Sequence, residues 1–426
     1  MNGSTPSPKP AAPGLRLHAL DNLRAAMMWL GIVLHVAVIY MSRPSPLPWH
    51  DDQATPVADL PVAVIHAFRM PVFFILAGFF VSLLVHRRGL ADMVRHRLRR
   101  LGLPFVVFWP PLFAASALLG LAFLHRMAHG TWGLDRSLMP QSTTVTTGPN
   151  TMHLWFLWML LWLAMLTPLL WAAVRALPAG LQHALGRIVA WLGGTPLGIV
   201  VLTLPLAWIG AGYDHGVVTP NGSFLPPLAE WLHNGLFYGF GLCLYAQQKA
   251  LMARYEKHWP VLAGLGLACF LITAVLSEVL AQPEASAFAL VLVTGAFADI
   301  LAAPVSATRH LQFWMALAYN CASGLWSLAL IGFFLRHVAQ ARAWLAYLDD
   351  SSYWVYLVHL PMTIGWGALL HGLPIPVLAK MLINVLATTA LCLATYHLGV
   401  RFTAVSQLLN GHRHTRPPSG ETAHAT

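Results

Sequence analysis

The sequence is short of charged residues. Only 9% of its 426 residues are Asp, Glu, Lys or Arg, whereas 57% are hydrophobic and the mean hydropathy is +0.63. Soluble domains carry about 25% charged residues, so this composition excludes a soluble globular protein. It predicts an all-α fold, a polytopic bundle of transmembrane helices whose surroundings are the lipid bilayer.

Cysteines are also few, and familiar ligand motifs are missing. The four cysteines stand in apolar runs without CxxC spacing, which argues against a disulfide framework and a cysteine-based zinc site. The sequence contains neither an HExxH nor a GxxxxGK[ST] motif. We therefore expect no metal ion and no cofactor. The cysteines are Cys243, Cys269, Cys321 and Cys392.

Ten segments are long and apolar enough to span a membrane. An eleventh, 286–307, is apolar but contains Asp299 and Pro304. Ten spans with a cytoplasmic N-terminus place more of the 25 Lys and Arg residues inside than eleven spans do, so ten are favoured and eleven stay possible. The net charge of +10 thus indicates topology rather than a nucleic-acid partner. The ten segments are 20–40, 62–84, 104–124, 153–174, 188–210, 228–246, 260–280, 312–335, 352–370 and 374–400.

The two ends of the chain have a different composition. Residues 1–18 are rich in Pro and Ser, and residues 406–426 are rich in polar side chains. Such segments have too little apolar surface to form a core. We expect disordered cytoplasmic tails at 1–18 and 406–426 around an integral membrane domain at 19–405. The first span has no signal-peptide features and is expected to be retained.

The first span carries an arginine and a histidine eleven residues apart. Ionisable groups inside a membrane are costly and often mark a functional site. On a helix, eleven residues bring His35 to within about 20° of the face of Arg24 and roughly 16 Å farther along the axis. Arg24 also follows Asp21 by three residues, the spacing of a local ion pair. An arginine snorkelling at the membrane surface explains Arg24 alone, but not a histidine in mid-span.

Further polar groups lie in other predicted spans. His66 and Arg69 are one turn apart in the second span, and Ala77-Gly78 after them lets helix backbones approach closely. His153 begins the fourth span, at the outer boundary, before a run of tryptophans. Each histidine alone is explained as well by packing as by catalysis, but together they indicate a polar cavity.

The segment DDSSYWVYLVHLP, 349–361, holds the last of these groups. Its first four residues are typical of a helix start, because Asp and Ser side chains cap backbone N–H groups. His359 then falls in the middle of the span.

The order of these motifs resembles the acyltransferase-3 family of membrane O-acyltransferases. DNLRAAMMWLGIVLH (21–35) matches the family signature of an arginine, ten residues and a histidine, and HAFRMPVFFILAGFF (66–80) matches the second motif. RLRRLGLPF (97–105), HLWFL (153–157) and YLVHLP (356–361) follow in the expected order. The resemblance covers nearly the whole chain and is strongest to the branch called glucans biosynthesis protein C, which adds succinyl groups to periplasmic glucans.

The resemblance implies an enzyme of the bacterial inner membrane. Members move an acyl group, here succinyl or acetyl, from a cytoplasmic acyl-CoA to a hydroxyl of a periplasmic or cell-surface glycan, with a glucan as the first candidate. Acyl transfer from a thioester needs a base for the hydroxyl proton, and neutral histidine suits that task near pH 7.

Residue roles follow from the matched motifs. The resemblance implies His35 as the catalytic histidine with Arg24 as its signature partner. Arg69 matches the arginine of the second motif, where Ala77-Gly78 replaces the family's Ser-Gly, so a serine hydroxyl is absent there. The residues expected to bind substrate are Arg69, His66, His153 and His359.

Interpretations from other functional classes remain open. Buried histidines and arginines are also typical of a proton-coupled secondary transporter, although the chain lacks the paired broken spans that such a transporter predicts. A polysaccharide export partner would act by binding alone. The acyl group, an acyl-histidine intermediate and the oligomeric state are not determined by the sequence. The acid that orients His35 is also open, and the candidates are Glu230, Glu278 and Asp299.

Overall fold

The chain is helical throughout the part that the structure describes. In this computed structural model, the described residues form no strand beyond a single β-bridge between Met41 and Thr55. The predicted all-α fold is therefore confirmed. The described residues are 13–45, 47–139, 149–213, 216–281, 307–340 and 342–415.

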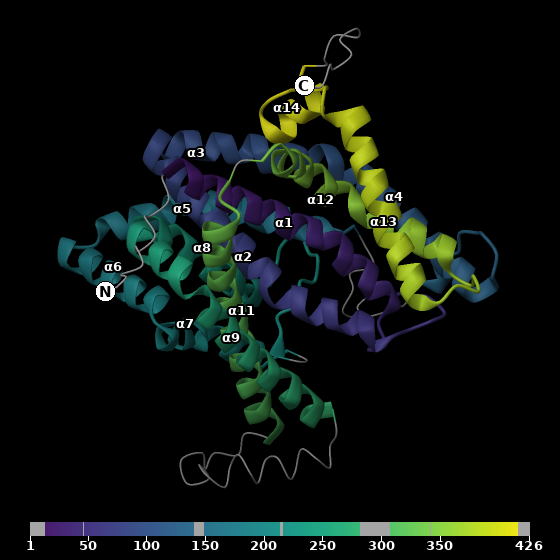
Figure 1. Ribbon diagram of the computed structural model, residues 1–426, viewed down its shortest axis with the longest axis horizontal. Coiled ribbons are helices and arrows are strands. Elements are labelled where there is room, and N and C mark those ends of the chain that lie inside the picture. The colour runs from purple at the N-terminus through teal and green to yellow at the C-terminus, as the bar shows by residue number, and fades with distance from the viewer. Residues whose placement is uncertain are drawn as a thin grey trace, which may run out of the picture. The chain divides into compact units, whose positions relative to one another are not determined.

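The helices vary widely in length (Figure 1). Five-residue π-helical turns at Leu98–Gly102 and Tyr396–Val400 join α3 to α4 and extend α13. The α-helices are α1 (Pro13–Tyr40), α2 (Pro56–Arg88), α3 (Leu90–Arg97), α4 (Leu103–His129), α5 (Trp155–Ala176), α6 (Ala179–Gly194), α7 (Pro196–Gly210), α8 (Leu228–Ala246), α9 (Gln248–Ala281), α11 (Ala307–His337), α12 (Ala343–Leu370), α13 (Val377–Thr395) and α14 (Ala404–Asn410).

Several helices have the length and composition of membrane spans. Seven helical stretches of the described residues qualify, or eight when the bent pair α6 and α7 is taken as one span. Helices α8 and α12, at the predicted spans 228–246 and 352–370, are not among them. Both carry buried polar groups, such as Glu230 and His359. The expected count of ten is not confirmed, and segment 286–307 lies almost wholly outside the described residues.

The predicted single span at 188–210 is broken. Helices α6 and α7 meet at a bend of 102°. Thr195 between them has an extended backbone, with φ −133° and ψ 148°, because a residue before proline is disfavoured in the helical region. Its hydroxyl accepts a hydrogen bond from Gly198 N–H and so caps α7. Hydropathy over this segment is insensitive to the Thr195-Pro196 step, so the predicted span at 188–210 gives no sign of the bend.

The chain divides into two compact units. The first consists of Met1–Arg24, Val64–Val94 and Trp162–Arg342, and the second of Ala25–Ala63, Arg95–Leu161 and Ala343–Thr426. In the first unit α9 and α11 lie side by side, and α7 packs against α11 (Figure 1). In the second unit α12 packs against α4 and α13. The predicted domain boundaries at 19 and 405 stay a prediction.

Helices α2 and α8 touch backbone to backbone in the first unit. A Cβ atom built on Gly78 would meet the carbonyl oxygen of Tyr238 and lie 2.8 Å from the backbone nitrogen of Leu242. From the other side, a Cβ atom on Gly241 would meet the carbonyl oxygen of Ile75. Only glycine fits at this crossing, as the small residues at 77–78 indicated.

Replacing Gly78 by alanine should lower the thermal stability of the detergent-solubilised protein. The added methyl group has only rigid backbone to displace, and overpacking of this kind costs about 1–3 kcal/mol. Unfolding temperatures measured by fluorescence-detected size exclusion test this. Gly239→Ala on α8 is the matched control, since nothing lies within 4 Å of its Cβ position. If the Gly78→Ala protein is as stable as the Gly239→Ala protein, the backbones of α2 and α8 are not in close contact at Gly78.

Helix α12 starts earlier than its sequence indicates. It begins at Ala343, so residues 349–352 lie inside the helix rather than at its N-terminus. The hydroxyl of Ser351 donates to the carbonyl of Leu348, and that of Ser352 to the carbonyl of Asp349. Ser side chains occur both at helix caps and inside helices, where they donate to a carbonyl of the preceding turn. The helix start predicted at 349–352 was wrong for this reason.

Helices include some residues of both expected tails. Helix α1 begins at Pro13, and helix α14 occupies Ala404–Asn410. The hydroxyl of Thr403 caps α14 by accepting a hydrogen bond from Val405 N–H. Residues 1–12 and 416–426 lie outside the described part of the chain.

Candidate active site and its relatives

Three of the expected histidines gather in the second unit. His35 lies on α1, His153 on the short 3-10 turn before α5, and His359 on α12. The ring of His359 has its centroid 5.1 Å from that of His35 and 5.5 Å from that of His153. Residues separated by more than 300 positions in the sequence thus form one cluster of imidazoles.

Backbone carbonyls determine which ring nitrogens carry the protons. The Nδ1 atom of His359 lies 2.9 Å from the carbonyl oxygens of Val355 and Tyr356. A carbonyl only accepts, so Nδ1 is the donor and the neutral ring has its lone pair on Nε2. By the same argument Nε2 of His153 donates to the carbonyl of Leu357 at 2.9 Å. The lone pair of neutral His153 is then on Nδ1.

Two of the three histidines are buried, and a tyrosine helps to hold the cluster. His359 is 1% exposed and His153 8% exposed. The hydroxyl of Tyr356 donates to the carbonyl of His153 at 3.0 Å, and this ties the start of α5 to α12. Helix α1 is tied to α12 as well, because the indole N–H of Trp29 donates to the carbonyl of Leu348. The hydrogen bonds to backbone carbonyls fix the ring orientations of His153 and His359.

Arg24 is in the first unit, although it shares helix α1 with His35. Helix α1 runs without a break through both residues. The predicted ion pair is confirmed, with 3.3 Å between the Arg24 guanidinium and the Asp21 carboxylate. The guanidinium also lies over the ring of Phe80, 5.9 Å from its centroid.

His66 and Arg69 are in the first unit and differ in burial. Arg69 is 6% exposed, and its guanidinium lies 5.8 Å from the ring centroid of Phe73. His66, one turn earlier on α2, is exposed. The structure therefore gathers His35, His153 and His359 in one unit and places Arg24, His66 and Arg69 in the other.

Two of the acids considered as partners of His35 lie in the first unit, and the third lies outside the described residues. Glu230 is buried in the first unit, where its carboxylate accepts a hydrogen bond from Asn221 N–H at 2.9 Å. Glu278 is also in the first unit, and Asp299 lies outside the described residues. In the second unit the ordering of His153 and His359 comes from backbone carbonyls instead.

An apolar pocket of about 300 Å³ lies in the first unit. Its walls include Phe68, Trp259, Trp326 and Phe333, and no titratable side chain lines it. General acid–base chemistry needs a titratable group, so this pocket is not the candidate active site.

Sequence reasoning missed a charged cluster in the second unit. The ammonium of Lys380 lies 2.8 Å from Asp51 and 2.8 Å from Asp52. The imidazole of His371 is 3.9 Å from Asp51 and 3.8 Å from Asp52. The side chains of Lys380 and Asp51 are both 0% exposed. A lysine inside the predicted span 374–400 was the available signal, because a lysine there requires a partner.

The two carboxyls of this cluster differ in acidity. Burial raises the pKa of Asp51 to about 6, although the hydrogen bond from Lys380 acts to lower it. Partial burial also acts to raise the pKa of Asp52. The hydrogen bonds from Lys380 and Gly372 N–H outweigh that effect and hold the Asp52 pKa below its usual value. Burial lowers the pKa of His371.

Comparison with known proteins identifies the family. The acyltransferase-3 family model, described as an acyltransferase domain, matches residues 17–397. Glucans biosynthesis protein C of Escherichia coli (strain SMS-3-5 / SECEC) is 26% identical over 367 residues, 84% of this chain and 84% of the relative. The protein of the same name from Escherichia coli O81 (strain ED1a) is 26% identical over 374 residues, with the same shares. No solved structure gave a significant match. The family match spans most of the chain, so this multi-pass membrane protein belongs to the acyltransferase-3 family and is an acyltransferase.

Proposed function

We propose that the protein is an O-acyltransferase of the bacterial inner membrane that modifies an extracytoplasmic glycan. The donor is a cytoplasmic acyl-CoA, the acyl group is succinyl or acetyl, and the acceptor is a hydroxyl of a periplasmic or cell-surface glycan. A glucan is the first candidate, since the relatives are named for glucan biosynthesis.

The observation that carries this proposal is the cluster of His35, His153 and His359. The glycan hydroxyl attacks the thioester carbonyl, a new C–O bond forms, and the C–S bond breaks to release the thiol of CoA. The hydroxyl proton has to be removed during attack and returned to the leaving sulfur. A neutral imidazole does both near pH 7, and we assign this role to His35.

The other residues receive supporting roles. His359 orients the His35 ring, because its own Nδ1–H is fixed on the carbonyls of α12 and its ring lies against His35. Arg24 is assigned to the anionic end of the donor, since guanidinium groups bind phosphate and carboxylate with paired hydrogen bonds. Arg69 is assigned to substrate binding, where it stabilises the negative charge that develops on the thioester oxygen or positions the sugar.

Mass spectrometry of cell-envelope glycans tests the proposal. Glycans from cells that carry the gene should be heavier by one or more acyl units than glycans from cells that lack it. The added mass identifies the acyl group, and the modified species identifies the acceptor. Reintroduction of the gene should restore the heavier glycans.

Two other outcomes would contradict an enzymatic role. Unchanged glycan masses with reduced export would indicate a polysaccharide export partner. Proton-dependent uptake of a solute into vesicles, with no covalent change in it, would indicate a secondary transporter.

A further inference from the structure

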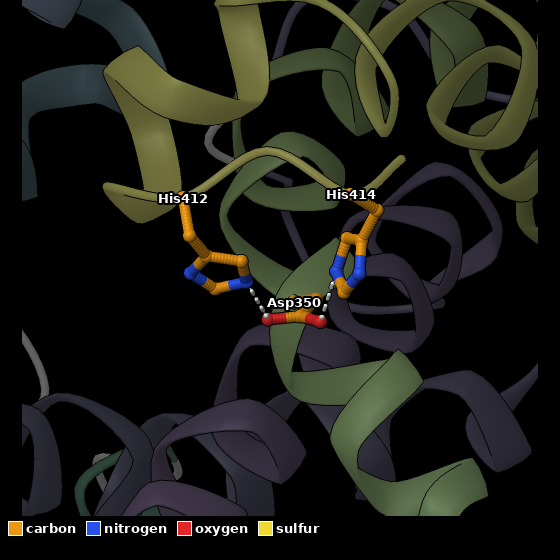
Figure 2. Close-up of side chains that lie close together, drawn as sticks. All are labelled: Asp350, His412 and His414. Atoms are coloured by element: carbon orange, nitrogen blue, oxygen red, sulfur yellow. Dashed lines mark hydrogen bonds and ion pairs between the residues drawn. The ribbon is translucent and has the colours of Figure 1, made fainter. Parts of the chain in front are cut away.

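A second cluster of ionisable side chains lies at one end of α12. The Nε2 atom of His412 is 3.3 Å from Oδ1 of Asp350, and Nε2 of His414 is 3.0 Å from Oδ2 of the same carboxylate. Figure 2 shows the two imidazoles on either side of the Asp350 carboxylate, one facing each oxygen. One donor atom from each residue lies within 4.8 Å of the others.

The chain holds this arrangement with several backbone contacts. Helix α14 is followed by Gly411, whose φ of 81° ends the helix and turns the chain. The hydroxyl of Ser406 donates to the carbonyl of His412, and the side-chain amide of Asn410 donates to the carbonyl of Asp350 at 2.7 Å. His412 and His414 are two residues apart, a spacing that directs both side chains to the same side of an extended segment.

We propose that Asp350, His412 and His414 bind a single divalent late-transition-metal ion, with zinc as the fitting ion. Two imidazole nitrogens and one carboxylate oxygen form a donor set that zinc prefers. Ligands of a tetrahedral zinc ion, each about 2.0–2.1 Å from the metal, lie about 3.3 Å apart. The two imidazole nitrogens lie 3.3 and 3.0 Å from the two oxygens of the Asp350 carboxylate, and one donor atom of each residue lies within 4.8 Å of the others. A water molecule completes the fourth position.

The accessibility of the ligands supports metal uptake. His412 has 53% of its side chain exposed and His414 has 32%, so an ion reaches both from solvent. The cluster of Asp51, Asp52 and His371 differs, because the ammonium of Lys380 already supplies the positive charge between those carboxylates.

The proposed metal site is distinct from the histidine cluster. Asp350 precedes His359 by nine residues on α12, about 14 Å along the helix axis. The ion would fasten the C-terminal segment to the helix that carries His359. The sequence lacks CxxC pairs and HExxH, which is why no metal ion was expected. The HRH triplet at 412–414 was the available signal, but its third ligand is 62 residues away.

Metal binding to the full-length protein tests the proposal. The protein is purified in detergent through a tag without histidine, freed of metal with a chelator, and titrated with Zn²⁺ in a calorimeter. A parallel titration with Co²⁺ reports tetrahedral geometry through its visible absorption. Wild-type protein should bind one equivalent with saturation, and His412→Ala/His414→Ala should not. Asp350→Asn should weaken binding at least about tenfold, because one anionic ligand is lost.

A matched control uses another histidine pair of the second unit. His125 and His129 on α4 have ring centroids 4.7 Å apart. The variant His125→Ala/His129→Ala should keep the full equivalent of metal. No saturable binding in the wild type, equal binding in His412→Ala/His414→Ala, or loss of binding in the α4 variant would each overturn the proposal.

Limited proteolysis gives a second readout that does not depend on a binding isotherm. Arg413 lies exposed between the two histidines, where trypsin cleaves after arginine. Zn²⁺ should slow cleavage after Arg413 in the wild type, because the ion holds both flanking side chains. In His412→Ala/His414→Ala the cleavage rate should be the same with and without Zn²⁺. A zinc effect that persists in the double variant would contradict the assigned ligands.

Discussion

Replacing His35 by alanine should reduce glycan acylation by about 10²- to 10⁴-fold, the contribution of a well-placed general base. Alanine leaves no group to take the hydroxyl proton during attack on the thioester. The other rings of the cluster do not move into its place, since the backbone carbonyls that accept from His359 Nδ1–H and His153 Nε2–H fix their orientations. The measurement is the acyl content of glycans in cells that make equal amounts of each protein.

The control for this experiment is a histidine outside the cluster. His183 on α6 is exposed, and its Nδ1 atom lies 2.7 Å from the carbonyl oxygen of Ala179 in its own helix. His183→Ala should acylate glycans like the wild type. Membrane insertion and the thermal unfolding of His35→Ala should also match the wild type, because His35 is only half-buried. Normal acylation in His35→Ala would rule out the assigned base.

The sequence predicted the members of the histidine cluster but not their arrangement. Helical periodicity relates only residues on the same helix. It predicts the relative positions of Arg24 and His35, but not that of His359, which lies 324 positions after His35. Conversely, two residues expected to bind substrate, His66 and Arg69, are in a different unit from His35. Motif order identifies a family, whereas the contacts between motifs depend on how long helices pack.

The errors have local physical causes. Averaged hydropathy ignores the restriction that Pro196 imposes on Thr195, so the break between α6 and α7 was not foreseen. The Asp and Ser residues at 349–352 are compatible with either a helix start or a helix interior, so they do not determine where α12 begins. The cluster around Lys380 and the pair of His412 and His414 both depend on partners far away in the sequence, which no spacing rule reveals.

Replacing Lys380 by methionine should destabilise the protein by about 3–5 kcal/mol, the usual effect of removing one partner of a buried ion pair. Methionine has a similar length but no charge, so the Asp51 carboxylate is left 0% exposed without its ammonium partner. The measurement is the thermal unfolding of the detergent-solubilised protein across a range of pH. Lys249→Met on α9 is the matched control, because Lys249 is exposed.

The pH dependence of this variant has a definite sign. Burial already raises the pKa of Asp51 to about 6 in the wild type, and loss of the ammonium removes an influence that lowers it. The folded variant then binds a proton that the unfolded chain, with a pKa near 3.8, releases. Its stability is therefore greatest at low pH and falls as the pH rises through the folded-state pKa of Asp51.

The double variant Asp51→Asn/Lys380→Met separates charge from packing. It removes both charges that face each other, while Asp52, 43% exposed, remains in contact with solvent. If the cost of Lys380→Met comes from an uncompensated carboxylate, the double variant regains most of the lost stability and loses the steep pH dependence. If both variants unfold at the same temperature at every pH, Lys380 stabilises the protein by packing, and the ion cluster is not what holds residues 51–52 against α13.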